Sequence, residues 1–310
     1  MRILNTLMRR RVAGNYKYSE NSEFKSFYKS LSSTASSGGA DNNRIILSPA
    51  SPSEPHILIV TLNRPEKMNS LDMPMFEAIS SAGKKIKKSM PHVRAVILRG
   101  EGRAFCSGLD VVSMLKCGMS SFDRLLDRPE DSITNLAQEV AYVWRTLDVP
   151  VIAAIHGVCF GGGLQIALGA DMRYATPDSK LSILESKWGL VPDMGASITL
   201  RELVSIDVAK ELTMTGRVIS GADASDLNLV TRCVADPLAE ALETAREISG
   251  RSPDSVAAAK RLYQETWAAG TSNEKILAVE TEMQRRLLPS YNQFVASVRN
   301  FGVKLPYKNK

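Results

Sequence analysis

The sequence predicts an α/β core followed by a helical region. Between about residues 56 and 175, short apolar runs alternate with segments whose apolar residues follow the helical period. Glycine-rich loops directly follow two of these runs, and beyond Pro192 almost every segment is helical in character. Such alternation is typical of a sheet covered by helices, whereas a later succession of helices forms a further layer or an appendage.

In the first part of the chain, apolar runs predict strands and a spacing of three to four residues predicts helices. Asp72 can accept hydrogen bonds from the free N–H groups of a helix that begins after it. A further helix starts directly after the glycine triplet. The expected strands cover residues 56–62, 93–98, 149–155 and 171–175, and the expected helices cover about 72–88, 132–147 and 164–168.

The second part of the chain is expected to be mostly helical. Residues 41–55 are expected to form a linker, because Pro49, Pro52 and Pro55 disfavour regular structure. We therefore expect a core over residues 56–235 and a helical C-terminal region over 236–310. The helices expected beyond Pro192 cover about 195–215, 222–228, 237–249, 253–268, 273–288 and 290–300.

Composition excludes several classes of protein. The 310 residues are 44% hydrophobic and 23% charged, which is ordinary for a globular protein. No apolar run approaches the roughly 18 residues of a membrane span. The four cysteines are scattered and form no Cys-x-x-Cys pair, so neither a disulfide scaffold nor a zinc module is expected, and we expect no metal site.

The net charge of +6 comes mainly from the N-terminus. Residues 1–40 contain seven basic and two acidic residues, so the remainder is nearly neutral and no nucleic acid is expected as a partner. This segment also contains eight serines, and Arg residues flank an apolar helical face that includes Leu4 and Leu7. These features are typical of a mitochondrial transit peptide and predict the mitochondrial matrix; the alternative is a basic tail with no targeting role.

Two glycine loops, residues 102–110 and 156–165, could carry chemistry. Neither has the glycine spacing of a dinucleotide or P-loop site, nor that of a nucleophile elbow. Gly161, Gly162 and Gly163 would let the backbone approach a ligand, and they begin a helix whose first N–H groups have no internal partner. Such N–H groups suit an oxygen that becomes negative during a reaction. The alternative is a tight turn that needs glycine for packing alone.

Two acidic residues flank an apolar run between the strand region and the later helices. Glu185 and Asp193 enclose residues 186–192, which include Trp188. A carboxyl group among apolar side chains has a raised pKa, as a general acid or base requires. The alternatives are a surface charge for each, or a helix cap for Asp193.

Four segments together resemble the crotonase (enoyl-CoA hydratase/isomerase) superfamily over about residues 56–302. The resemblance implies a crotonase (ClpP-like) spiral of ββα units with C-terminal helices that assemble a homotrimer or hexamer. It also implies a coenzyme A thioester as substrate and no permanently bound cofactor. The segments are residues 62–71, 104–110, 156–163 and 171–175.

The resemblance also assigns roles to residues. The backbone N–H groups of Ser107 and Gly162 would form an oxyanion hole for the thioester carbonyl. On the last helix of a neighbouring subunit, Phe294 matches a Phe-x-x-Lys pattern, but Ser297 replaces the lysine and Arg299 is the nearest base. The residues expected to contact the CoA thioester are Lys67, Met68, Phe105, Ser107, Leu109, Asp110, Gly161 and Trp188, together with Phe294 and Arg299.

The catalytic residues expected from the resemblance are Glu185, Asp193 and Gln165. Hydratases have two glutamates around a water; here one matches Glu185 and Gln165 replaces the other. Glu185 with Asp193 resembles Δ3,5-Δ2,4-dienoyl-CoA isomerases. Isomerisation of 3-enoyl- or 3,5-dienoyl-CoA is therefore favoured, and Gln165→Glu is expected to raise hydration. A 2-enoyl-CoA hydratase and a non-catalytic protein that binds acyl-CoA or RNA remain open alternatives.

Overall fold

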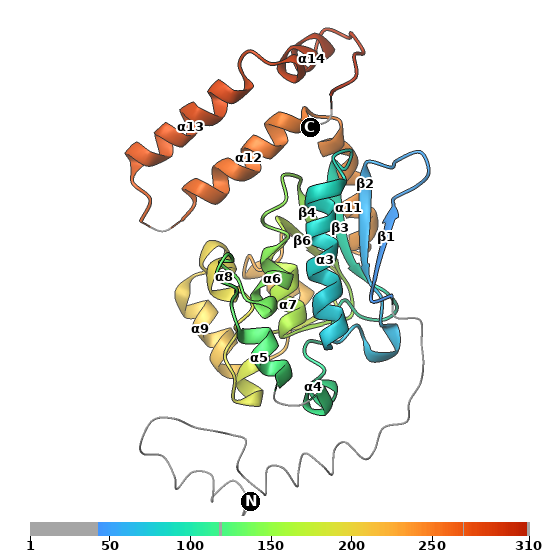
Figure 1. Cartoon of the computed structure of the whole chain (residues 1–310), viewed down its shortest axis with the longest axis vertical. Coiled ribbons are helices and arrows are strands. Elements are labelled where there is room, and N and C mark those ends of the chain that lie inside the picture. The colour runs from blue at the N-terminus through green and yellow to red at the C-terminus, as the bar shows by residue number, and fades with distance from the viewer. Residues whose placement is uncertain (1–42, 118–119, 269, 309–310) are drawn as a thin grey trace, which may run out of the picture.

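The computed structural model describes residues 43–117, 120–268 and 270–308 (Figure 1). The expected targeting segment, residues 1–40, lies outside these ranges. A six-stranded sheet has the order β1-β2-β3-β4-β6-β9, in which β1 is antiparallel to β2 and the other neighbours are parallel. Its strands are β1 Ile45–Pro49, β2 Ile57–Leu62, β3 Ala95–Gly100, β4 Val151–Ile155, β6 Met172–Ala175 and β9 Arg232–Cys233.

A second, three-stranded sheet has the order β5-β7-β8. Its strands are β5 Val158–Phe160, β7 Lys180–Ser182 and β8 Ile219–Ser220. The chain passes from a strand of the large sheet to a short strand of this sheet and then to a helix. The sequence β4, β5 and α7 Gly162–Leu168 is one such unit. Periodicity did not predict these short strands, because two or three residues carry too little pattern.

The expected linker over residues 41–55 is wrong where β1 forms. β1 pairs along its length with β2 and buries Ile45. It is the edge strand of the sheet, and Pro49 is its last residue, so the missing N–H of proline costs no hydrogen bond inside the sheet. Pro52 and Pro55 lie in the turn that leads to β2, where proline is expected.

Asp72 caps α3 Met73–Ser89 as expected, because its carboxylate accepts from the Met75 N–H at 3.0 Å. The expected helix over 132–147 is shorter: α6 Leu136–Tyr142 begins after Asn135. The expected helix over 195–215 is broken at Val204, whose backbone is extended. The other helical elements of this part are η2 Pro65–Lys67, α4 Val111–Cys117, α5 Ser120–Leu126, η3 Glu185–Trp188, α8 Ala196–Leu203, α9 Ile206–Thr215 and α10 Gly221–Asp226.

Both faces of the large sheet are covered. Val96 and Leu98 of β3 belong to the main core, which includes residues of α3, α6 and α7. Ala95 and Ile97 point to the other face, because side chains alternate along a strand. There they belong to one cluster with Ala241 of α11 Pro237–Ser249. The expected C-terminal helical region therefore begins with a helix that packs on the sheet.

The last helices are α12 Pro253–Thr266, α13 Asn273–Leu287 and α14 Tyr291–Arg299, close to the expected ranges. α12 and α13 lie side by side at the opposite end of the molecule from α4 and α5 (Figure 1). Lys260 joins α12 to the core: its ammonium donates to the Trp144 and Val149 carbonyls and pairs with Asp171 at 2.8 Å. Within the described residues, no helix is long and apolar enough to cross a membrane.

We expect a chain that begins at residue 43 to fold and to keep its activity, because β1 is then complete. A chain that begins at residue 50 loses the buried Ile45 side chain, worth roughly 1.5–3 kcal/mol, and the 2.7 Å ion pair between Arg44 and Asp72. Thermal unfolding of the two chains measures the difference. Equal melting temperatures would show that β1 contributes little, and failure of the first chain to fold would show that residues 1–42 are structural.

Candidate active site

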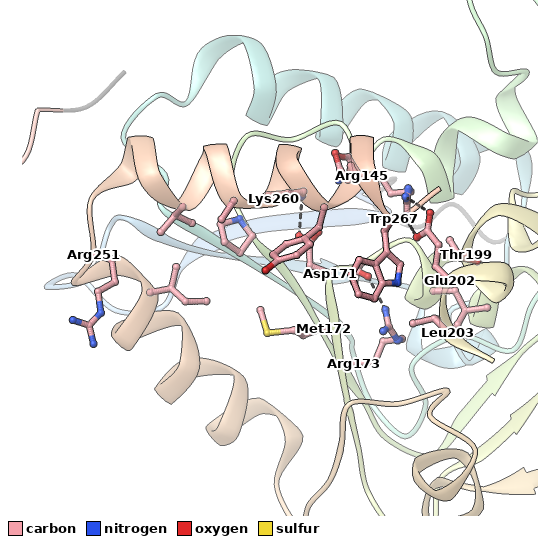
Figure 2. A pocket seen from close by; sticks show the side chains of 18 residues that line it. Arg145, Asp171, Met172, Arg173, Thr199, Glu202, Leu203, Arg251, Lys260 and Trp267 are labelled. Carbon is pink, nitrogen blue, oxygen red and sulfur yellow. Dashed lines mark hydrogen bonds and ion pairs between the residues drawn. The ribbon is translucent and has the colours of Figure 1, made fainter. Parts of the chain in front are cut away.

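A first cavity has several charged side chains in its wall, most of which already have partners. It has a volume of about 700 Å³ and lies between α12, β6 and α8 (Figure 2). Arg145 makes two hydrogen bonds to Glu202, at 2.8 and 2.9 Å, and Lys260 pairs with Asp171. Arg173 donates to two backbone carbonyl groups. These contacts stabilise the structure, so we place the chemistry in the second cavity.

The second cavity, of about 290 Å³, brings both glycine loops and both acidic residues together. Most of its wall is apolar, and Ser107, Glu185 and Asp193 are its polar side chains. The full lining is Phe76, Ser107, Gly108, Leu109, Val111, Phe122, Leu125, Leu126, Ala137, Gly161, Gly162, Leu184, Glu185, Trp188, Leu190, Val191, Asp193 and Met194. A largely apolar cavity with a few convergent polar groups is the usual form of a small-molecule site.

Asn69 fixes the first glycine loop, a role that sequence reasoning missed. Its backbone is left-handed (φ 56°), and its side-chain oxygen accepts from the Arg64 N–H at 2.8 Å. Its amide nitrogen donates to the carbonyls of Glu101 and Ala104 at 2.9 and 2.8 Å. A buried amide that joins the backbone at Arg64 to the backbone over residues 101–105 holds the loop in one shape. Asparagine tolerates the left-handed region well, and that preference was the available signal.

The second glycine loop needs its glycines for two different reasons. Gly161 has φ 50° and ψ −122°, a conformation that suits glycine. A Cβ on Gly163 would lie 2.5 Å from the Cys106 carbonyl, so this glycine is required for packing. Gly162 begins α7, and its N–H has no acceptor among the described residues. Gly162 also lines the cavity, so its N–H is an available donor at a helix N-terminus beside it.

The Ser107 N–H, the second donor expected in the oxyanion hole, is not free in this structure. It donates to the Met68 carbonyl at 2.9 Å. Met68 is left-handed (φ 50°), and it follows η2 directly. A thioester oxygen can use both expected donors only after the Met68 carbonyl gives up the Ser107 N–H. In this state the hole has one free donor, the Gly162 N–H.

Glu185 is a buried carboxyl with one free oxygen. It is 9% exposed at the start of η3, and its Oε1 accepts from the Gln165 amide at 2.6 Å. Its Oε2 is buried and has no hydrogen-bond partner within the described part of the chain. Burial raises the pKa of Glu185, Asp193 raises it further, and the hydrogen bond from Gln165 opposes this effect. A raised pKa is the property that a general acid or base needs, so Glu185 is a candidate for proton exchange.

Asp193 lines the same cavity, and burial raises its pKa also. The alternative interpretation of Asp193 as a helix cap is wrong. The residue that precedes α8 is Gly195, and no side chain caps this helix. Asp193 is thus a second carboxyl group that can hold a proton beside Glu185.

Gln165 lies behind the cavity wall and does not line it. Its side chain is buried, and its oxygen accepts from the backbone N–H groups of Met194 and Ala196 at 2.9 and 3.4 Å. Its nitrogen donates to Glu185. The amide therefore contacts protein groups at both ends and does not face the cavity, although the resemblance placed Gln165 among the catalytic residues.

The expected CoA-binding residues fall into two groups. Lys67 and Met68 lie beside the first glycine loop, where the Ser107 hydroxyl donates to the Lys67 carbonyl at 3.3 Å. Leu109, Gly161 and Trp188 line the cavity, and Trp188 is 61% exposed at its edge.

Phe105 and Asp110 are placed differently. The Phe105 side chain is fully buried, so the backbone is the part of it that a ligand could reach. Asp110 accepts from Arg64 at 2.8 Å and from the Ser113 N–H at 3.0 Å, which occupies its carboxylate with structural contacts.

Phe294 and Arg299 do not join the cavity of their own chain. Both belong to α14, at the opposite end of the molecule from α4 and α5 (Figure 1). Phe294 is 54% exposed. Arg299 donates to the Leu305 carbonyl, and its guanidinium lies 4.3 Å from the centre of the Tyr307 ring.

The cysteines and the histidine of the loops have structural contacts. Cys106 and Cys159 are fully buried, and burial raises the pKa of the Cys106 thiol to about 12 and that of Cys159 well above its usual value. Neither thiol is poised to ionise as a nucleophile. His156 makes a 2.8 Å hydrogen bond to the Gly102 carbonyl, which joins the two loops.

Residues 53–306 match the protein-family model described as enoyl-CoA hydratase/isomerase. The chain is 33% identical over 218 residues to an enoyl-CoA hydratase of Mycobacterium tuberculosis, covering 68% of this chain and 78% of the relative. It is also 33% identical over 219 residues to the mitochondrial Δ3,5-Δ2,4-dienoyl-CoA isomerase of Rattus norvegicus, covering 66% of this chain and 64% of the relative.

The structure resembles that of an enoyl-CoA hydratase from Bacillus anthracis. The TM-score is 0.77 at 25% sequence identity, over 86% of this chain and 100% of the other. Sequence and structure comparisons therefore agree on one family, whose members include both hydratases and isomerases.

Proposed function

The chain belongs to the enoyl-CoA hydratase/isomerase family and has the crotonase fold expected from its sequence, and from this premise we propose that it moves a double bond in enoyl-CoA thioesters of fatty-acid oxidation. The substrate is 3-enoyl- or 3,5-dienoyl-CoA, and the substrate itself brings the CoA. One observation carries the proposal: Glu185 and Asp193, both with a raised pKa, line one apolar cavity with the free Gly162 N–H.

The proposed reaction begins at the carbon next to the thioester. Glu185 takes a proton from this carbon through its free Oε2, and the electron pair moves onto the thioester oxygen. The Gly162 N–H and the N-terminus of α7 stabilise the negative charge that develops there. Asp193 then gives a proton to the far end of a dienoyl chain, and the proton on Glu185 returns to Asp193 before the next turnover. For a 3-enoyl chain, Glu185 alone can take the proton and return it.

The arrangement favours double-bond migration over hydration. The hydratases of the family are expected to use two glutamates around a water, whereas here Gln165 replaces one of them and does not line the cavity. Migration along a dienoyl chain needs one group that takes a proton and a second group that already holds one, further along the chain. Glu185 and Asp193 meet this need, because burial raises the pKa of both carboxyl groups and Asp193 raises that of Glu185 further.

A substrate panel tests the proposal directly. The protein is mixed separately with 2-enoyl-, 3-enoyl- and 3,5-dienoyl-CoA, and products are followed by ultraviolet absorbance and identified by mass and retention time. We expect migration to exceed hydration. Hydration of 2-enoyl-CoA at a typical enzymatic rate, without migration, would favour the hydratase alternative. No change with any substrate would favour a non-catalytic binding protein.

Asp193→Asn is expected to slow migration in dienoyl substrates by about 100-fold or more, which is usual for loss of a positioned acid. Migration in 3-enoyl substrates should change much less, because Glu185 can carry that proton alone. The ratio of the two kcat values measures the effect. Asp207→Asn, which changes an exposed aspartate on α9, is the matched control and should leave the ratio unchanged. An unchanged ratio in Asp193→Asn would remove Asp193 from the mechanism.

We also propose a homotrimer, or a dimer of trimers, built through the C-terminal helices. Large apolar side chains on these helices are exposed in the single chain: Trp267 is 66% and Leu277 is 60% exposed. Phe294 and Arg299 would then reach the CoA of a neighbouring subunit. The composition of residues 1–40 and the mitochondrial relative support a mitochondrial matrix location. Light scattering of the purified protein tests the assembly.

A further inference from the structure

The side chain of Gln165 contacts both segments that carry the acidic residues. Its nitrogen donates to Glu185 Oε1 at 2.6 Å, at the start of η3. Its oxygen accepts from the N–H of Met194, the residue after Asp193, at 2.9 Å, and from the N–H of Ala196 in the first turn of α8 at 3.4 Å. The residue is 1% exposed, so these contacts are shielded from bulk solvent.

The direction of these hydrogen bonds is fixed by chemistry. Backbone N–H groups can only donate, so the Gln165 atom that faces Met194 and Ala196 is the oxygen, and the atom that faces Glu185 is the nitrogen. The Glu185 oxygen at this contact is therefore an acceptor. If Glu185 carries a proton, the proton lies on Oε2, which has no other partner within the described part of the chain.

We propose that Gln165 is a positioning residue that holds Glu185 and the turn of Asp193 in one hydrogen-bonded frame and thereby makes Glu185 Oε2 the oxygen that exchanges the proton. This inference rests on the proposed function for the reaction. The hydrogen bonds of Gln165 are the same whether the reaction is isomerisation or hydration.

Few charged groups lie around Glu185, so the effect of Gln165 on the pKa of Glu185 can be measured. α7 carries no titratable side chain. On η3, Lys187 is exposed, and on α9, Asp207, Lys210 and Glu211 are exposed as well. Asp193, on the turn before α8, raises the pKa of Glu185, whereas the Gln165 amide favours the ionised form.

Gln165→Met removes all three side-chain hydrogen bonds of this residue at nearly constant volume. We expect kcat to fall by about 10- to 100-fold, as for a misplaced catalytic group, with little change in KM. The acid limb of the kcat profile should move to higher pH, because Glu185 loses the donor that favours its ionised form. Gln264→Met is the matched control. It removes a half-buried amide of α12 that donates to the Arg145 carbonyl and does not line the cavity of Glu185, so it should leave the profile unchanged.

The structure predicts for Gln165→Glu the opposite result from the one expected by sequence alone. The N–H groups of Met194 and Ala196 favour a negative charge at position 165, so the shared proton goes to Glu185, which then cannot act as base. We expect migration at neutral pH to fall at least about tenfold, without a gain in hydration. An increase in hydration with migration intact would overturn the inference.

An infrared pH titration tests the hydrogen-bonded frame without an activity assay. The protonated carboxyl band that is absent from Glu185→Gln identifies Glu185, and its midpoint should move to higher pH in Gln165→Met. An unchanged midpoint, together with an unchanged kcat profile, would overturn the inference. The natural protein could instead be inactive on the whole substrate panel while the Glu185 midpoint still shifts in Gln165→Met. That outcome would contradict the proposed function and support the hydrogen-bonded frame.

Discussion

Glu185→Gln is expected to lower kcat by about 100- to 10,000-fold, the usual range for a positioned base, with little change in the affinity for a CoA thioester. Glutamine keeps the size of the side chain but cannot take a proton. The proposed reaction routes the proton from the substrate through Oε2, and the described part of the cavity wall offers Asp193 as the one other carboxyl group. Steady-state kinetics, with CoA-thioester binding measured by calorimetry, tests both expectations.

The melting temperature of Glu185→Gln shows whether this substitution acts on the chemistry or on the structure. Because burial raises the pKa of Glu185, its ionised form costs free energy in the folded protein at neutral pH, so the neutral isostere should fold at least as well. Glu202→Gln weakens the two hydrogen bonds to Arg145 and should lower the melting temperature while leaving kcat unchanged. If Glu185→Gln keeps more than a tenth of the natural kcat, Glu185 is not the base.

The pH dependence of the natural enzyme follows from the same group. Glu185 must be ionised to take a proton, so kcat should fall as the pH drops through its pKa. Since burial raises this pKa, the fall should occur above the usual range of a carboxyl group.

Gly162→Pro is expected to lower kcat by about 100- to 1000-fold, the typical loss for one oxyanion donor. Proline is well tolerated at the first position of a helix, and Gly162 is the first residue of α7, so the substitution removes the free N–H with limited damage to the helix. The charge that develops on the thioester oxygen then loses its available donor. The ratio of the kcat values of Gly162→Pro and Gly162→Ala measures the contribution of the Gly162 N–H.

Gly162→Ala is the matched control because it adds a Cβ but keeps the N–H. That Cβ would meet the flexible ends of Met194 and Leu71 at 2.8 and 2.9 Å, and these side chains can move. Ser107→Ala also keeps its N–H and should retain most activity. Equal activity of the proline and alanine variants would show that the Gly162 N–H does not bind the reacting oxygen, and complete loss in a folded Ser107→Ala would assign chemistry to the hydroxyl.

Several parts of the fold could be predicted from the sequence because their causes are local. The helix after Asp72 begins where the sequence predicts, since a cap and its helix are adjacent in the chain. β1 was missed because its stability comes from pairing with β2, which outweighs the proline-rich composition around it. The break between α8 and α9 was missed also, since the helical period continues across Val204 although the backbone there is extended.

The sequence by itself determined the family, the glycine triplet at a helix start and the presence of two acidic residues around an apolar run. These features depend on residue type and spacing along the chain. The tertiary structure alone decided that Glu185 and Asp193 share one cavity, that Gln165 lies behind its wall, and that the Ser107 N–H is bonded to Met68. Each of these outcomes depends on a partner from a distant segment, and a hydrogen bond or a burial energy exists only when the fold brings the two segments together.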